Sequence, residues 1–226
     1  MLAPDRARRY TENMKHVPVY REAVEVPALP GLFVRPLESS LLEQARGETN
    51  WRRLRAYLGV FESYSLYLHI PQKVQTLAFL YELLMHREGD LRRQAGALMG
   101  EIIAGFHAGY AKERPADSRS DAGVPTDLDQ WKLYLEKIIY PDHKLMPQHR
   151  RWIGYTLKFA VNSLLQHSAG REERFLSPLF AYYRHPEQVA DTVAFQLLDT
   201  AAALPAAAYS LSLIHISEPT RQAEIS

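Results

Sequence analysis

From residue 37 onward, apolar residues recur at every third or fourth position, which is the spacing of one face of an α-helix. The clearest run covers residues 51–68 and places six residues on one stripe: Trp51, Leu54, Leu58, Phe61, Ser65 and Leu68. Asn50 precedes this run, and its side chain can accept a hydrogen bond from a free amide of a first helical turn. We therefore predict a helix that begins directly after Asn50.

The same pattern predicts further helices along the rest of the chain. Pro71 can open the next one, because a proline in the first turn has no helix hydrogen bond to lose. This helix carries a broad apolar face that we expect to be deeply buried: Val74, Leu77, Ala78, Leu80, Tyr81, Leu84 and Met85. More helices are predicted over 91–108, 128–139, 147–166, 172–183 and 186–204. The predicted fold class is all-α.

Two segments lack the helical pattern. Residues 1–37 carry five prolines, which favour extended or looping chain after a short helix over 4–15. Residues 20–26 alternate weakly and fit either one short strand or, as we favour, a connector. Residues 112–127 contain almost nothing to bury and are predicted to be a polar loop. The expected organisation is a proline-rich lead-in over 1–37 and a helical domain over 38–210.

Three of the predicted helices can be aligned with one another, namely 91–103, 149–161 and 190–202. The equivalent residues Ala95, Ile153 and Ala194 lie 58 and 41 positions apart. Without the polar loop, the first interval shortens to about 42 residues, so both intervals are near 40 residues. The third copy has Asp191 where the first two have arginine.

The segment from Asp90 to Gly100 resembles the second helix of a HEAT repeat. It has an acidic start, an apolar–Arg pair and small residues before Leu98-Met99-Gly100. The resemblance is good over 74–106, fair over 128–165 and weak over 174–204. It implies an α-solenoid of about three antiparallel helix pairs. A single pair cannot bury so wide an apolar face, so neighbouring pairs must stack around one continuous core.

Residues 211–226 resemble the conceptual translation of a sequencing-library adapter over their whole length. We expect the natural sequence to stop near Ser210, where the sequencing read ends, and such a library origin suggests a bacterial source. The tail should pack against nothing, and its deletion should leave the melting temperature unchanged. We also expect an apolar face around 195–203 to be partly exposed.

The composition excludes several classes of function. The net charge of +1 argues against binding to bulk nucleic acid or to an anionic membrane. The chain has no cysteine, which excludes disulfides, thiolate nucleophiles and cysteine-ligated metals. No apolar run approaches the roughly 20 residues that a membrane span requires, and no secretory signal is recognisable. We expect a cytoplasmic location.

The sequence offers little support for catalytic residues. No nucleophile elbow, phosphate-binding glycine loop or zinc signature occurs. Asp142 and His143 are adjacent in the segment that follows Pro141, where a turn capped by Asp142 is favoured over a metal or acid–base role. His107, His149 and His167 stand alone near predicted helix ends. We predict no catalysis, no cofactor and no metal.

The paired arginines are the most informative polar feature. Arg92-Arg93 and Arg150-Arg151 occupy equivalent repeat positions, so stacked repeats would bring them into a row. They could bind carboxylate or phosphate groups of a partner, with Trp152 beside them. Alternatively, one arginine of each pair bridges neighbouring repeats and the other is solvated, which we favour. For Trp152 we favour a role in helix packing over one in an aromatic-lined ligand groove.

The sequence thus favours a non-catalytic scaffold or protein-interaction segment of a larger soluble protein. Its partner would be a protein, a peptide or another domain of the same chain. A first alternative is a regulatory or accessory region of a multidomain bacterial enzyme, which catalytic motifs in a longer reading frame would support. A second alternative is a solenoid that binds the nucleic-acid backbone, which a salt-dependent mobility shift would support.

Overall fold

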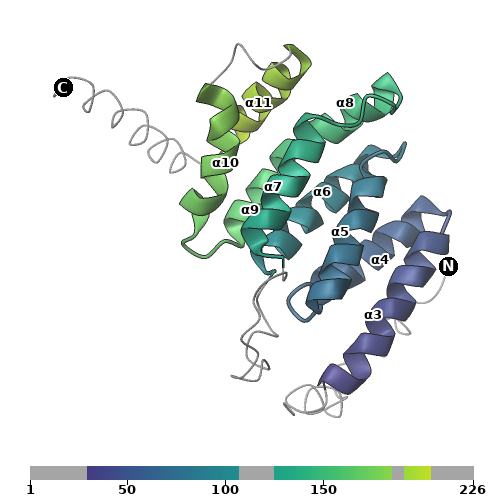
Figure 1. Cartoon of the computed structure of the whole chain (residues 1–226). Coiled ribbons are helices and arrows are strands. Elements are labelled where there is room, and N and C mark those ends of the chain that lie inside the picture. Colours follow the sequence, from purple (N-terminus) through teal and green to yellow (C-terminus); the bar gives the residue numbers. More distant parts are fainter. Residues whose placement is uncertain (1–29, 107–124, 185–190, 205–226) are drawn as a thin grey trace, which may run out of the picture. The chain divides into compact units, whose positions relative to one another are not determined.

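The computed structural model describes residues 30–106, 125–184 and 191–204 of the 226-residue chain. These residues form helices joined by turns and contain no strand (Figure 1). The prediction of an all-α chain is therefore confirmed for this part of the sequence. Residues 1–29, most of the polar loop predicted at 112–127, and the adapter-like segment 211–226 lie outside the described residues. The chain divides into two compact units, residues 1–41 and residues 42–226.

Helix α3 (Pro30–Gly47) corrects the predicted lead-in, because residues 30–37 are helical rather than extended or looping. Pro30 is the first helical residue, where the fixed φ of proline suits the helix and its missing N–H has no consequence. Pro36 lies inside the helix, where it lacks the N–H that would bond to the carbonyl four residues earlier. The proline content therefore did not predict the structure of residues 30–37, because Pro30 starts the helix.

Helix α4 (Trp51–Tyr64) begins as predicted. The Asn50 side-chain oxygen accepts a hydrogen bond from the backbone N–H of Arg52 at 3.0 Å. The predicted stripe is confirmed, since five of its six members are buried: Leu54, Leu58, Phe61, Ser65 and Leu68. Local capping chemistry and the helical period therefore predicted this element and its buried face.

Helix α5 (Ile70–Leu83) has Pro71 in its first turn, as predicted. Its buried face differs from the predicted one, because Lys73 and Thr76 are buried whereas Ala78 is exposed. The Lys73 ammonium donates hydrogen bonds to the backbone carbonyls of Gly105 and Phe106. It thereby binds carbonyls at the end of the next helix, which have no partner within that helix. Lys73 is buried because its ammonium group lies against these carbonyls at the end of α6.

The most extensive helix contact lies between α6 (Gly89–Ala104) and α9 (Leu157–Gln166). Glycines allow the two backbones to approach closely: a Cβ built on Gly100 would lie 2.2 Å from the carbonyl oxygen of Ala160. A Cβ on Gly96 would lie 3.3 Å from the carbonyl oxygen of Thr156. Because residue 96 faces 156 and residue 100 faces 160, the two helices run in the same direction.

The single helix predicted over 147–166 is wrong, because the structure contains two helices there, α8 (Pro147–Tyr155) and α9. The interruption lies at Thr156, whose hydroxyl donates a 2.6 Å hydrogen bond to the carbonyl of Ile153. A hydroxyl that bonds to the preceding turn competes with the helix hydrogen bonds and bends the chain. The apolar period continues through Thr156, so periodicity alone did not reveal the break.

Helix α7 (Asp127–Ile139) starts with a capping box in which Thr126 and Asp129 bond each other's backbone N–H groups. The end of the predicted polar loop is thus a helix start, because Asp127 already belongs to α7. Helix α10 (Glu172–Arg184) packs against α7. The Trp131 ring N–H donates a 2.7 Å hydrogen bond to the carbonyl of Phe175 across this contact.

Helix α11 (Asp191–Ala203) packs against α8 and α9. The Gln196 amide lies against Gly154, and the Lys158 ammonium lies 3.0 Å from an Asp199 carboxylate oxygen. Contacts in this order show that α11 runs in the same direction as α8 and α9. Its outer side leaves Phe195 and Leu198 59% and 66% exposed, which confirms the expected partly exposed apolar face.

Candidate functional site

Arg92 is the predicted site residue with the most extensive contacts. One of its guanidinium nitrogens donates hydrogen bonds to the carbonyls of His86, at 2.6 Å, and of Arg87, at 2.9 Å. Its guanidinium carbon lies 4.5 Å from the ring centre of Trp152, which belongs to α8. Burial, and then the charge of Arg93, lower the pKa of Arg92. Arg92 therefore joins the chain after α5 to α6 and α8.

Arg93 points to a different partner. Its guanidinium pairs with the carboxylate of Asp90, one turn earlier on α6, and both side chains are at least half exposed. The Asp90 carboxylate also lies 3.9 Å from a guanidinium nitrogen of Arg55. Much of the charge of Arg93 is therefore balanced on the surface, and it contributes little free positive charge.

Trp152 lies between two other side chains. The guanidinium of Arg92 lies over its ring, and the ring of His149 lies 5.4 Å from it between centres. Cation–π contacts of this kind contribute about 0.5–1 kcal/mol at partly exposed positions. Trp152 thus connects the start of α6 to the second half of α8, and these two helices carry the arginine pairs.

Arg150 and Arg151 lie on α8 and, unlike Arg93, make no ion pair within the described part of the chain. Both line a cavity of about 350 Å³ between the end of α7, the start of α8 and α11. The other lining residues are mainly apolar: Ile139, Tyr140, Pro141, Pro147, Val193 and Gln196. The sequence placed both arginines correctly in one helix but could not indicate the cavity.

Two lining residues carry buried polar atoms that are not satisfied. Neither the Nε of Arg150 nor the Oε1 of Gln196 has a hydrogen-bond partner within the described structure. Gln196 is only 9% exposed, and its amide occupies the space that a side chain at Gly154 would need. Buried polar groups are usually hydrogen-bonded, and each one left without a partner destabilises the fold by about 1–3 kcal/mol. No sequence pattern indicated Gln196 or Gly154.

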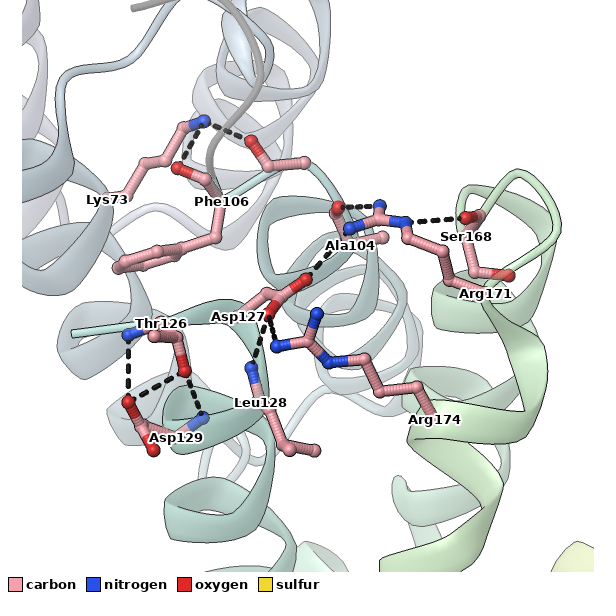
Figure 2. A network of polar contacts seen from close by, with 11 residues as sticks. Lys73, Ala104, Phe106, Thr126, Asp127, Leu128, Asp129, Ser168, Arg171 and Arg174 are labelled. Atoms are coloured by element: carbon pink, nitrogen blue, oxygen red, sulfur yellow. Dashed lines mark hydrogen bonds and ion pairs between the residues drawn. The ribbon is translucent and has the colours of Figure 1, made fainter. Parts of the chain in front are cut away.

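A second polar cluster, not predicted from the sequence, surrounds Asp127 (Figure 2). Its carboxylate is 2% exposed and lies 2.8 Å from guanidinium nitrogens of both Arg171 and Arg174. It also accepts a 2.8 Å hydrogen bond from the N–H of Leu128. Arg171 donates further hydrogen bonds to the carbonyls of Ala104, at 2.7 Å, and Ser168, at 2.9 Å. Because these donors and acceptors satisfy one another, we assign the Asp127 cluster a structural role.

The remaining candidate residues are held by local structure. The Asp142 carboxylate accepts a 2.9 Å hydrogen bond from the N–H of Lys144, which confirms the predicted capped turn. His143 is exposed, and the ring of His167 bonds the carbonyl of Ser163 at 2.8 Å. His107 lies outside the described residues. Over the described ranges, no three potential metal ligands gather, and no helix is long and apolar enough to cross a bilayer.

A second cavity, of about 290 Å³, lies between α4, α6 and α9. Its charged lining residues are acidic, whereas those of the cavity beside α11 are basic. Glu62 and Glu101 line it together with the side chains of Gln94, Asn162 and His167. Glu101 accepts a hydrogen bond from the hydroxyl of Ser65. None of the described residues that line this cavity is a lysine or an arginine. Of these two cavities, the one lined by Arg150 is therefore better suited to an anion.

The chemistry that these residues can perform is recognition. Two guanidinium groups and a carboxamide beside apolar side chains can bind a carboxylate whose neighbouring atoms are apolar. The start of α8 adds the positive end of a helix dipole to the same region. Comparison of the chain with known proteins returned no matching family model, no similar curated protein and no similar solved structure.

Proposed function

We propose that the chain is a helical-repeat interaction module, an α-solenoid of HEAT-like helix pairs that binds an acidic segment of a partner protein. The observation that carries this proposal is the row formed by α6, α9 and α11. Gly100 faces Ala160, 60 positions later, and Lys158 pairs with Asp199, 41 positions later. These spacings are close to the 58 and 41 positions of the sequence repeat. Equivalent helices that run in one direction are the arrangement expected of stacked repeats.

The outer side of α11 supports the same proposal. Phe195 and Leu198 lie three positions apart on one helix face and remain largely exposed. In a solenoid, each repeat covers the apolar face of the one before it, and a terminal repeat without such a neighbour leaves that face open. The exposed stripe on α11 therefore corresponds to the face on which a further helix pair would stack.

The binding surface in this proposal is the arginine-bearing region formed by the start of α6 and by α8. Arg92 and Trp152 hold these two helices together, and Arg150 and Arg151 face the cavity beside α11. Guanidinium groups bind carboxylates with two parallel hydrogen bonds, so the partner segment should be rich in Asp and Glu. The partner can be a separate protein or another domain of the same chain.

A peptide-display selection against the purified chain tests the proposal. We expect enrichment of acidic peptides that bind with dissociation constants in the micromolar range, about −8 kcal/mol. The double variant Arg150→Ala/Arg151→Ala should weaken binding of the enriched peptides by about tenfold or more. Arg53→Ala is the matched control, because Arg53 is an exposed arginine on α4, and it should leave the affinity unchanged.

Two outcomes would contradict this function. The first is a selection that enriches no acidic sequence, which would remove the arginine surface as a peptide site. The second is stronger binding of a 30-base-pair DNA duplex than of any selected peptide, with the steep salt dependence of backbone contacts. The second outcome would favour a solenoid that binds the nucleic-acid backbone.

A further inference from the structure

The cavity beside α11 offers an unusual combination of groups. Among the described residues, its polar lining comes from Arg150, Arg151 and Gln196, and none of its described lining residues is acidic. Its remaining lining is aromatic or aliphatic. A ligand for this cavity must therefore carry a negative charge directly beside an apolar group.

The buried polar atoms without hydrogen-bond partners restrict the class of ligand further. Within the described residues, the Nε–H of Arg150 is a donor without an acceptor, and the Oε1 of Gln196 is an acceptor without a donor; both atoms are buried, so the side chains must turn to meet a ligand. Rotation about the terminal torsion of Gln196 is soft, so its amide can turn either end toward a ligand. The best ligand thus combines a carboxylate, for the arginines, with a nearby N–H, for the glutamine.

We propose that this cavity binds the C-terminal residue of a partner peptide. Only at its C-terminal residue does a peptide carry a carboxylate, a backbone N–H and an apolar side chain on the same carbon atom. The carboxylate would bind Arg150 and Arg151, the N–H would donate to Gln196, and the side chain would pack against Tyr140 and Val193. The proposal rests on the proposed function, since it names which part of a partner peptide is bound.

Gly154 is the positioning residue of this site. The Gln196 amide lies where a Cβ at position 154 would be, within 1.8 Å of the amide nitrogen. Alanine at this position would push the flexible end of Gln196 away from α8. Gly154 therefore allows α8 and α11 to present the two arginines and the amide to one ligand.

The test uses fluorescence anisotropy with a labelled octapeptide of Asp, Glu and Ser residues that ends in leucine. The same peptide is measured with a free carboxylate and with a C-terminal amide, against the full chain. We expect the free acid to bind about tenfold or more tightly than the amide, because the amide cannot accept paired guanidinium hydrogen bonds. Arg150→Lys and Gly154→Ala should each reduce this preference. Gly59→Ala, on α4 with open space around it, should not.

The outcomes separate the two proposals. If both peptides bind equally and Arg150→Ala weakens both, the C-terminal site is wrong while the acidic-peptide function stands. If Gly154→Ala folds normally and leaves the preference unchanged, Gln196 is not part of the site and the assignment is overturned. If neither peptide binds, the C-terminal site is again wrong, and the display selection decides the general function independently.

Discussion

Gly100 of α6 lies directly against the main chain of Ala160 in α9, with room for no side chain between them. The nearest atoms are backbone atoms, which cannot move aside as the end of a flexible side chain can. The most extensive helix contact in the second unit thus depends on a residue at position 100 whose side chain is only a hydrogen atom. The contact gives α6 and α9 their close approach.

The Gly100→Ala substitution should destabilise the protein by about 1–3 kcal/mol, because the added methyl group forces the two helices apart. Gly59→Ala is the matched control, since Gly59 also lies inside a helix but has nothing within 4 Å. It should stabilise the protein by about 0.5–1 kcal/mol through helix propensity. Urea denaturation measures both, and equal effects of the two substitutions would contradict the close contact.

The Asp127→Asn substitution tests the buried carboxylate. Asparagine keeps an oxygen for the N–H of Leu128 but removes the charge that pairs with Arg171 and Arg174. We expect a loss of about 2–3 kcal/mol in the free energy of unfolding, since both arginines remain partly hydrated. Asp199→Asn removes a more exposed ion pair with Lys158 and should lose less than about 1 kcal/mol. Similar losses would show that the burial of Asp127 is unimportant.

His86 should make the stability depend on pH. Its Nδ1 accepts a 3.1 Å hydrogen bond from the N–H of Glu88, which requires a neutral ring. Burial lowers the pKa of His86; Arg87 and Arg92 lower it further, while Glu88 opposes them. Below about pH 6.5 the unfolded chain therefore binds a proton that the folded chain does not, and stability falls as the pH falls.

The measurement compares the free energies of unfolding of wild type and His86→Asn between pH 8 and 5. Asparagine can accept the same hydrogen bond and does not titrate. The wild type should lose more stability than the variant as the pH decreases. Parallel curves would mean that His86 keeps its ordinary pKa in the folded chain.

Tyr134 should make the stability of the protein depend on pH in alkaline solution. Burial, with a smaller contribution from Tyr81, raises the pKa of Tyr134 to about 12. The unfolded chain loses this proton near pH 10, so the stabilisation is complete below pH 10 and disappears as the pH rises toward 12. Tyr134→Phe should lose less stability than wild type between pH 9 and 11. Tyr155→Phe, at an exposed position, controls for the removal of one phenol.

The sequence predicted the elements whose signals are local. Asn50 and Pro71 begin helices as expected, because capping and first-turn chemistry act within four residues. The break at Thr156 was missed, since a threonine inside an apolar period can stay in a helix or bond to the preceding turn. Lys73 was missed because its burial depends on the end of α6, 32 residues away in the chain.

The site was predictable only in part. The repeat alignment placed the arginine pairs in equivalent helices, and the structure joins these helices through Arg92 and Trp152. Gln196 and Gly154 had no signal, because a glycine that makes room for an amide 42 positions later has no local pattern. Nor could the alignment distinguish Arg93, which pairs with Asp90 one turn earlier, from Arg151.

The contacts of Arg171 have a consequence for how the helices unfold. This side chain reaches the carboxylate of Asp127, 44 residues earlier, and the carbonyl of Ala104, 67 residues earlier. Stacked helix pairs can fray from their ends one at a time, since each contacts only its neighbours. Here, loss of α10 together with Arg171, which directly precedes it, would leave Asp127 as a lone charge inside the protein, so α7 could not persist without them. The central helices should consequently melt together in one cooperative transition rather than in steps.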